Sequence, residues 1–130
     1  MASIFSKIIA GEIPSYKVAE SDSCYAFLDI NPLAKGHTLV VPKQEVDYIF
    51  DVDDSLYTEL MLFAKKVGKA IEKAVPCERI GVTVLGLEVP HAHVHLIPIN
   101  ALNDMNFAKP KLHFSKEEFE ELAQRINQYL

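Results

Sequence analysis

The stretch that decides the fold is His91-Ala92-His93-Val94-His95-Leu96-Ile97. Histidines alternate in it with small or apolar residues, and side chains two apart in a β-strand share a face. We therefore expect a strand over residues 91–99 that buries Ala92, Val94 and Leu96 and presents three imidazoles to a cleft. Histidine is a weak strand former that gains nothing on a solvated sheet face, so the pattern indicates a functional site.

The rest of the chain predicts helices and further strands. Apolar residues at helical spacing indicate helices over residues 4–9, 56–75 and 116–130, the last after a capping box that begins at Ser115. β-branched and apolar runs indicate strands over residues 16–20, 24–30, 37–41 and 79–85. Short links between neighbouring strands favour antiparallel pairing. We therefore predict an α+β fold, with a single antiparallel sheet of about five strands and two to three helices packed on it.

Length and charge limit the possible functions. The 130 residues fit a single domain, residues 1–130, because the sequence has no internal repeat or linker-like tract. The 13 Lys and Arg against 18 Asp and Glu give a formal charge of -5, without the basic excess that binds polymeric nucleic acid. The longest charge-free apolar run, Ile80 to Leu87, is too short to cross a bilayer, and the amino terminus does not resemble a secretion signal. We expect a cytoplasmic domain without membrane or polymeric nucleic-acid partners.

Zinc binding is the main alternative use of three histidines. Side chains two apart on a strand stand about 6.8 Å apart at the backbone, whereas zinc lies about 2.0 to 2.1 Å from each ligand nitrogen. Two of the histidines could bind one ion, but a third ligand would have to come from His37 or His113. Cys24 and Cys77 have no metal-binding spacing and are expected to be ordinary thiols. We expect that no metal or other cofactor is required.

A tetrahedral phosphorus suits the histidine pattern better, because the flanking groups can contact different oxygens of one phosphate. Neutral imidazole is abundant near pH 7 and attacks phosphorus without a base. We predict that His93 is the nucleophile and that its second ring nitrogen donates to a carbonyl or carboxylate. His91 and His95 are then expected to hydrogen-bond phosphoryl oxygens and to assist proton transfer to the leaving group.

Three blocks of the sequence, SIFSKIIAGEIP at 3–14, CYAFLDINPLAKGHTLVVPK at 24–43 and HAHVHLIP at 91–98, resemble the histidine triad (HIT) superfamily near its Hint branch of nucleotide-binding phosphoramidases. The resemblance implies a homodimer whose sheets join. It also implies hydrolysis or transfer at the α-phosphorus of a purine nucleotide, with substrates such as adenosine 5'-phosphoramidate and a nucleotidyl-His93 intermediate. It further implies a hydrogen bond between His37 and His91.

The same resemblance assigns a nucleoside pocket. It places an acidic residue, here Asp29, on both ribose hydroxyls, and a carboxylate suits a cis-diol because it has two acceptor oxygens. The apolar residues that it places around the base are Phe5, Ile8, Phe27 and Ile30. From the residues alone, Phe5, Ile8 and Phe27 are expected in the core, and Asp29 is expected to begin a turn.

The loop before the triad departs from the family pattern. Where the family often has a polar, glycine-rich loop, this chain has Gly86-Leu87-Glu88-Val89-Pro90. The Leu87 side chain cannot donate a hydrogen bond, and Glu88 would repel phosphate if it faced the site. The candidate contacts are therefore the backbone N–H groups of Leu87, Glu88 and Val89. Two other functions therefore stay open: a non-catalytic purine-nucleotide sensor and a dinucleoside polyphosphate hydrolase.

The carboxyl-terminal part also departs from it. The resemblance covers a core of about residues 3–99, and residues 100–130 form an extension that contains the last helix. In related proteins such a tail can reach the partner's site. From the residues alone, we expect Lys109, Lys111 and His113 to be exposed to solvent.

Overall fold

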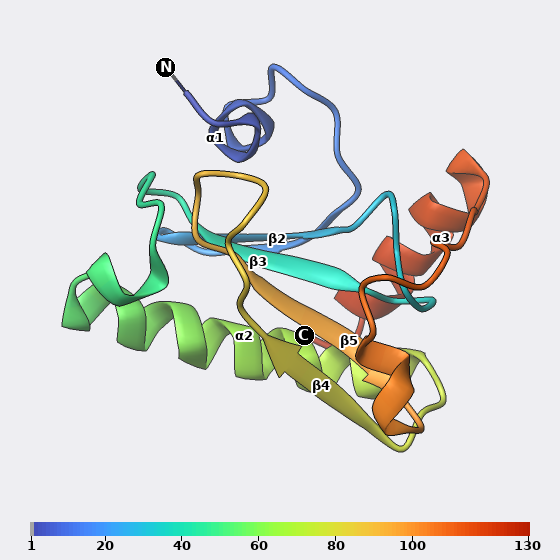
Figure 1. Ribbon diagram of the computed structural model, residues 1–130. Coiled ribbons are helices and arrows are strands. Elements are labelled where there is room, and N and C mark those ends of the chain that lie inside the picture. The colour runs from blue at the N-terminus through green and yellow to red at the C-terminus, as the bar shows by residue number, and fades with distance from the viewer. Residues whose placement is uncertain (1) are drawn as a thin grey trace.

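The computed structural model describes residues 2–130. Five strands form one antiparallel sheet in the order β1-β2-β3-β5-β4 (Figure 1). They are β1 (Lys17–Glu20), β2 (Cys24–Leu28), β3 (Thr38–Pro42), β4 (Arg79–Thr83) and β5 (Val94–Ile99). The helices are α1 (Ile4–Ile9), α2 (Asp54–Ala74) and α3 (Lys116–Asn127), with short 3-10 helices η1 (Ile49–Asp51) and η2 (Leu102–Met105). The predicted α+β class with a single antiparallel sheet is confirmed.

Helices α2 and α3 cover one face of the sheet (Figure 1). The Asp53 side chain caps the first turn of α2, and the predicted capping box of Ser115 and Glu118 begins α3. Helix α2 packs on the sheet through an apolar stripe whose fully buried members include Leu60, Val67 and Ile71. Burial of each such side chain contributes roughly 1.5 to 3 kcal/mol to stability, so this helical layer stabilises the sheet from the face that it covers.

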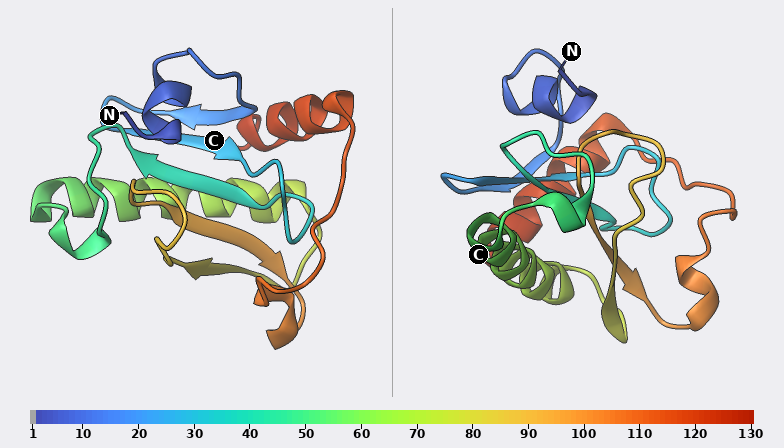
Figure 2. Two further views of the ribbon diagram at one scale, coloured as in Figure 1. Left: turned by 45° about the horizontal axis from the view of Figure 1, so that its top comes forward. Right: turned by 60° about the vertical axis from the view of Figure 1, so that its left-hand side comes forward.

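Helix α1 lies on the opposite face of the sheet (Figures 1 and 2). Phe5 and Ile8 of α1 pack there on Tyr25, Phe27 and Leu39, which point away from α2. Alternate residues of β2 and β3 therefore enter two different apolar clusters, and both strands are buried along their whole length. This explains why both read as continuous apolar runs rather than as alternating ones.

Strand β5 begins at Val94, three residues later than predicted. Its ladder with β3 stops at the pair of Val40 and Val94. Beyond that point the backbone bonds elsewhere: the Ala92 N–H donates to the Val46 carbonyl oxygen at 2.7 Å. The alternation of faces nevertheless continues, because Ala92 and Val94 are buried in apolar clusters while the histidines face the α1 side.

Beyond η2 the chain runs along the loop that joins β2 to β3 before α3 begins (Figure 2). The Leu112 N–H donates to the Pro32 carbonyl oxygen at 2.8 Å and joins the two segments. Among residues 2–130, no helix combines the length and the apolar character that crossing a membrane requires.

Candidate active site

A cavity of about 270 Å³ lies between α1, the end of β2 and the histidines. Ile4, Ile13, Pro14 and neighbouring residues complete its wall. The predicted site residues that line it are Phe5, Ile8, Phe27, Asp29, Ile30, Glu88, Val89, His93 and His95. Leu87 does not belong to this set: the residue is 90% exposed and does not line the cavity.

His93 has a fixed tautomer. Its Nδ1–H donates to the backbone carbonyl oxygen of His91 at 2.8 Å, which leaves the lone pair on Nε2. Burial lowers the pKa of His93, so the ring is neutral near pH 7. The Phe5 ring packs against it with centroids 5.0 Å apart. The predicted hydrogen bond from the second ring nitrogen to a carbonyl is therefore confirmed.

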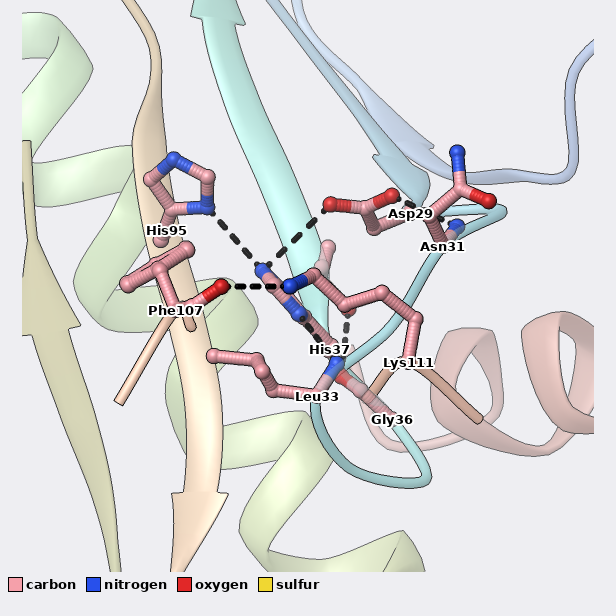
Figure 3. A network of polar contacts seen from close by, with 9 residues as sticks. Asp29, Asn31, Leu33, Gly36, His37, His95, Phe107 and Lys111 are labelled. Atoms are coloured by element: carbon pink, nitrogen blue, oxygen red, sulfur yellow. Dashed lines mark hydrogen bonds and ion pairs between the residues drawn. The ribbon is translucent and has the colours of Figure 1, made fainter. Parts of the chain in front are cut away.

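His37 and His95 form a directed hydrogen-bond chain (Figure 3). The Leu33 N–H donates to His37 Nδ1 at 3.0 Å, so the proton of the neutral His37 ring must sit on Nε2. That Nε2–H donates to His95 Nδ1 at 3.0 Å, which places the His95 proton on its own Nε2. Burial lowers the pKa of His37 to about 3 and that of His95 to about 4, so both rings are neutral near pH 7. His95 therefore offers an N–H donor at the cavity wall.

The prediction that His37 bonds His91 is wrong, because His37 bonds His95. The cause is the register of β3 on β5. Antiparallel pairing sets Leu39 opposite His95, so the start of β3 lies beside the last histidine of the triad. His91 lies beside the other end of β3, where its Nε2–H donates to the Pro42 carbonyl oxygen at 2.7 Å.

His91 is fully buried, and both of its ring nitrogens are engaged. Nε2 bonds Pro42, and the Ser3 hydroxyl donates to Nδ1 at 2.7 Å. No ring nitrogen is left for a phosphoryl oxygen, so the predicted phosphate contact of His91 is corrected to a positioning role. The backbone carbonyl oxygen of His91 accepts the hydrogen bond from His93 Nδ1–H, so an anchored His91 orients the His93 ring.

Ser3 and Glu45 are site residues that sequence reasoning missed. Ser3 caps α1 with its hydroxyl while its backbone N–H donates to Glu45 Oε1 at 2.6 Å. Ser6 Oγ donates to the same carboxylate oxygen at 2.7 Å. A serine before an apolar helical run signals an N-cap, but nothing in the sequence connects it to a histidine 88 positions away.

The Asp29 side chain closes a turn and also faces the cavity. Its Oδ1 accepts from the Asn31 N–H at 2.8 Å and closes the expected turn. Its Oδ2 lies 3.6 Å from His37 Nε2, and the side chain also lines the cavity. Burial is the main influence on this carboxyl and raises its pKa.

Asp29, His37 and His95 also bring three potential metal ligands within 4.8 Å of one another. Metal binding to His37 Nε2 would require the ring proton to move to Nδ1. The Leu33 N–H already points at Nδ1, so two donors would then face each other across 3.0 Å. The donor set therefore does not fit a metal ion. His113, the other ligand considered, is exposed to solvent as expected.

Residues after β5 also reach the histidines. The Phe107 ring packs on the His95 ring with centroids 4.9 Å apart. Lys111 is half-buried, and its Nζ donates to the Phe107 carbonyl oxygen at 2.6 Å, so the prediction that it is exposed to solvent is wrong (Figure 3). No sequence signal indicated this contact, because the segment between η2 and α3 has neither helical nor strand periodicity.

Comparison with known proteins identifies the family of this chain. The HIT domain family model matches residues 10–102. Adenosine 5'-monophosphoramidase HNT1 of Saccharomyces cerevisiae is 42% identical over 98 residues, which cover 75% of this chain and 62% of that protein. Adenosine 5'-monophosphoramidase hnt1 of Schizosaccharomyces pombe is 35% identical over 130 residues, which cover 98% of this chain and 97% of that protein.

A solved structure shares the fold over the whole chain. The crystal structure of a Hit-like protein from Bartonella henselae superposes with a TM-score of 0.86 at 34% identity, covering 98% of this chain and 96% of the other. The family match spans all five strands and the four histidines described above. This chain is therefore a member of the HIT family, in its Hint-like branch.

Proposed function

We propose that this HIT protein is a nucleotide hydrolase that cleaves adenosine 5'-phosphoramidate and related substrates through a nucleotidyl-His93 intermediate. The observation that carries the proposal is the bond from His93 Nδ1–H to the His91 carbonyl oxygen, which leaves a nucleophilic Nε2 at the cavity. The names of the two yeast relatives supply the substrate class.

The first chemical step forms a bond between His93 Nε2 and the α-phosphorus while the P–N bond breaks. The leaving nitrogen keeps the bonding electron pair, takes one proton from solvent and departs as an amine. In the second step, water attacks the same phosphorus and releases one proton to solvent, while the P–N bond to His93 breaks and neutral His93 leaves with that electron pair. The products are the nucleoside 5'-monophosphate and the amine, and His93 is regenerated.

His95 stabilises charge in both steps rather than acting as a strong acid. Its low pKa keeps it neutral, so its Nε2–H donates a hydrogen bond to a phosphoryl oxygen without carrying a charge. The chain from Leu33 through His37 holds this tautomer. His91 contributes through the backbone carbonyl that orients His93.

The cavity supports a purine nucleoside as the bound part of the substrate. Phe5, Ile8, Phe27 and Ile30 supply apolar surface for a base, and Asp29 Oδ2 is the acceptor for ribose hydroxyls. The volume of about 270 Å³ lies near the lower end for ligand sites, which favours one nucleoside over two.

The test is a single-turnover incubation with labelled adenosine 5'-phosphoramidate, followed by acid-free quenching and mass analysis of the peptide that contains His93. We expect a mass increase of one nucleotidyl group that is absent in His93→Ala, although His93→Ala still binds the nucleotide. Binding without any intermediate or turnover in the unmodified protein would favour the non-catalytic nucleotide sensor.

We also propose that the protein forms a homodimer through β4, which is an edge strand with a half-exposed apolar residue, Val82. Light scattering should then give twice the monomer mass, and Val82→Glu should shift the protein to the monomer at equal concentration. A monomer in the unmodified protein would contradict this.

A cytoplasmic location stays a prediction of the sequence.

A further inference from the structure

The segment between β5 and α3 places an aromatic ring on the hydrogen-bonded pair of His37 and His95. Phe107 lies at a tilt of 74° to His95, with ring centroids 4.9 Å apart. It lies at 79° to His37, with centroids 6.2 Å apart. Both are edge-to-face arrangements, which aromatic rings favour. One side chain therefore contacts both members of the pair.

Phe107 lies outside the residues that match the HIT family model, 10–102. Three hydrogen bonds hold this part of the chain in place. Lys111 Nζ donates to the Phe107 carbonyl oxygen at 2.6 Å and to the Lys109 carbonyl oxygen at 3.1 Å, which closes a short loop. The bond between the Leu112 N–H and the Pro32 carbonyl oxygen then fastens this loop beside Leu33, the donor to His37.

We propose that Phe107 is a positioning residue for His95. Its ring packs against the His95 ring and keeps His37 as the hydrogen-bond partner of His95 Nδ1. Water that reached His95 Nδ1 would compete with the His37 Nε2–H and free the His95 ring to turn. The ring of Phe107 excludes water from that side of the pair. The proposal rests on the proposed function, because it gives His95 a defined orientation toward the reacting phosphorus.

A charged His95 would carry a proton on Nδ1 and lose the bond from His37. Removing the Phe107 ring should expose His95 to water. The pKa of His95 should therefore rise from about 4 toward its usual value, since burial is the main cause of the low value. The titratable groups that contact the pair or line the cavity beside it are His93, His37, Asp29, Glu88 and Lys111, and substitution of Phe107 replaces none of these side chains.

The experiment compares Phe107→Ala and Phe107→Leu with the unmodified protein and with Leu102→Ala. Leu102 belongs to the same segment and is 99% exposed, so its substitution is the matched control. The histidine rings are titrated by nuclear magnetic resonance in the full chain. Steady-state kinetics with adenosine 5'-phosphoramidate are measured over the same pH range, and thermal melting reports folding.

For Phe107→Ala we expect the pKa of His95 to rise by one unit or more. We expect kcat to fall about tenfold while KM changes less than twofold, because the nucleoside pocket is intact. The acid limb of the kcat profile should move to higher pH with His95. Phe107→Leu should show smaller shifts in the same directions. If the alanine variant does not fold, the leucine variant supplies both the His95 titration and the kinetics.

An unchanged His95 titration in both Phe107 variants, matching Leu102→Ala, would overturn the proposal. So would a rise in KM with kcat unchanged, because that pattern assigns Phe107 to substrate binding. Failure of the proposed function is separate: the unmodified protein would then form no nucleotidyl-His93, yet the titration of His95 would still decide the role of Phe107.

Discussion

Replacing Ser3 by alanine removes one hydroxyl that serves two partners at the same time. Ser3 Oγ donates to His91 Nδ1 at 2.7 Å and accepts from the Ser6 N–H at 3.0 Å as the N-cap of α1. Ser3 is only 6% exposed and His91 is fully buried, so solvent does not readily replace the lost bond. The substitution therefore tests whether α1 and the triad are joined as the hydrogen bonds indicate.

The expected loss of stability has two parts. Loss of a serine N-cap costs about 1 kcal/mol. An unpaired buried acceptor at His91 Nδ1 costs a further 1 to 3 kcal/mol, roughly. Ser6 Oγ lies 3.5 Å from the same nitrogen and can take over part of the bond by giving up its own bond to Glu45. We therefore expect the free energy of unfolding to fall by about 2 to 3 kcal/mol.

The assay is urea unfolding of Ser3→Ala, Ser3→Thr, Ser6→Ala and the double alanine variant, with the free energy obtained by linear extrapolation. Ser3→Thr keeps the hydroxyl and should stay within about 0.5 kcal/mol of the unmodified protein. The double variant should lose more than the sum of the single variants, because Ser6 can no longer substitute for Ser3. A loss for Ser3→Ala no larger than that of a cap alone would refute the dependence of His91 on Ser3.

Three further predictions concern binding, metal and pH. Asp29→Asn should weaken ribonucleotide binding about 10- to 100-fold and should penalise the 2'-deoxy analogue less, as calorimetry at fixed salt can measure; a coupling of zero would return Asp29 to its turn-forming role. Protein treated with EDTA should keep its activity, whereas recovery only with stoichiometric zinc would favour the metal alternative. Because burial lowers the folded-state pKa of His37 to about 3 and of His95 to about 4, the unfolded chain binds more protons below about pH 6.5. The free energy of unfolding should therefore fall as the pH is lowered from 7 to 4, and His37→Gln should reduce that slope in urea titrations.

The faces of the histidine strand could be predicted from the sequence, because the alternation of side chains is a local property of extended backbone. Ala92, Val94 and Leu96 are buried as that pattern indicates. The partner of His37 could not be predicted in this way. It depends on the register of β3 against β5, two strands that lie more than 50 residues apart and whose apolar runs would pair acceptably in more than one register.

The contacts of Phe107 and Ser3 could not be predicted for a related reason. Ser3 lies next to a helix whose signals are clear, whereas Phe107 lies in a segment without periodicity, and each makes its important contact with a histidine of another segment. Apolar periodicity reports which face of an element is buried and does not report what covers it. The nucleoside cavity was anticipated only through the family resemblance, since Phe5 and Phe27 are equally suited to a core.

The three histidines of the triad have the same side chain, and backbone groups give them different chemistry. The Pro42 carbonyl oxygen places a proton on His91 Nε2, and the His91 carbonyl oxygen places one on His93 Nδ1. The Leu33 N–H donates to His37 Nδ1, so the His37 proton sits on Nε2. That Nε2–H donates to His95 Nδ1, which leaves the His95 proton on Nε2. A backbone group keeps its hydrogen-bonding character whatever the pH, so it fixes a tautomer more firmly than a titratable side chain would. In this way one repeated residue type supplies an anchor, a nucleophile and a hydrogen-bond donor within five positions of the sequence.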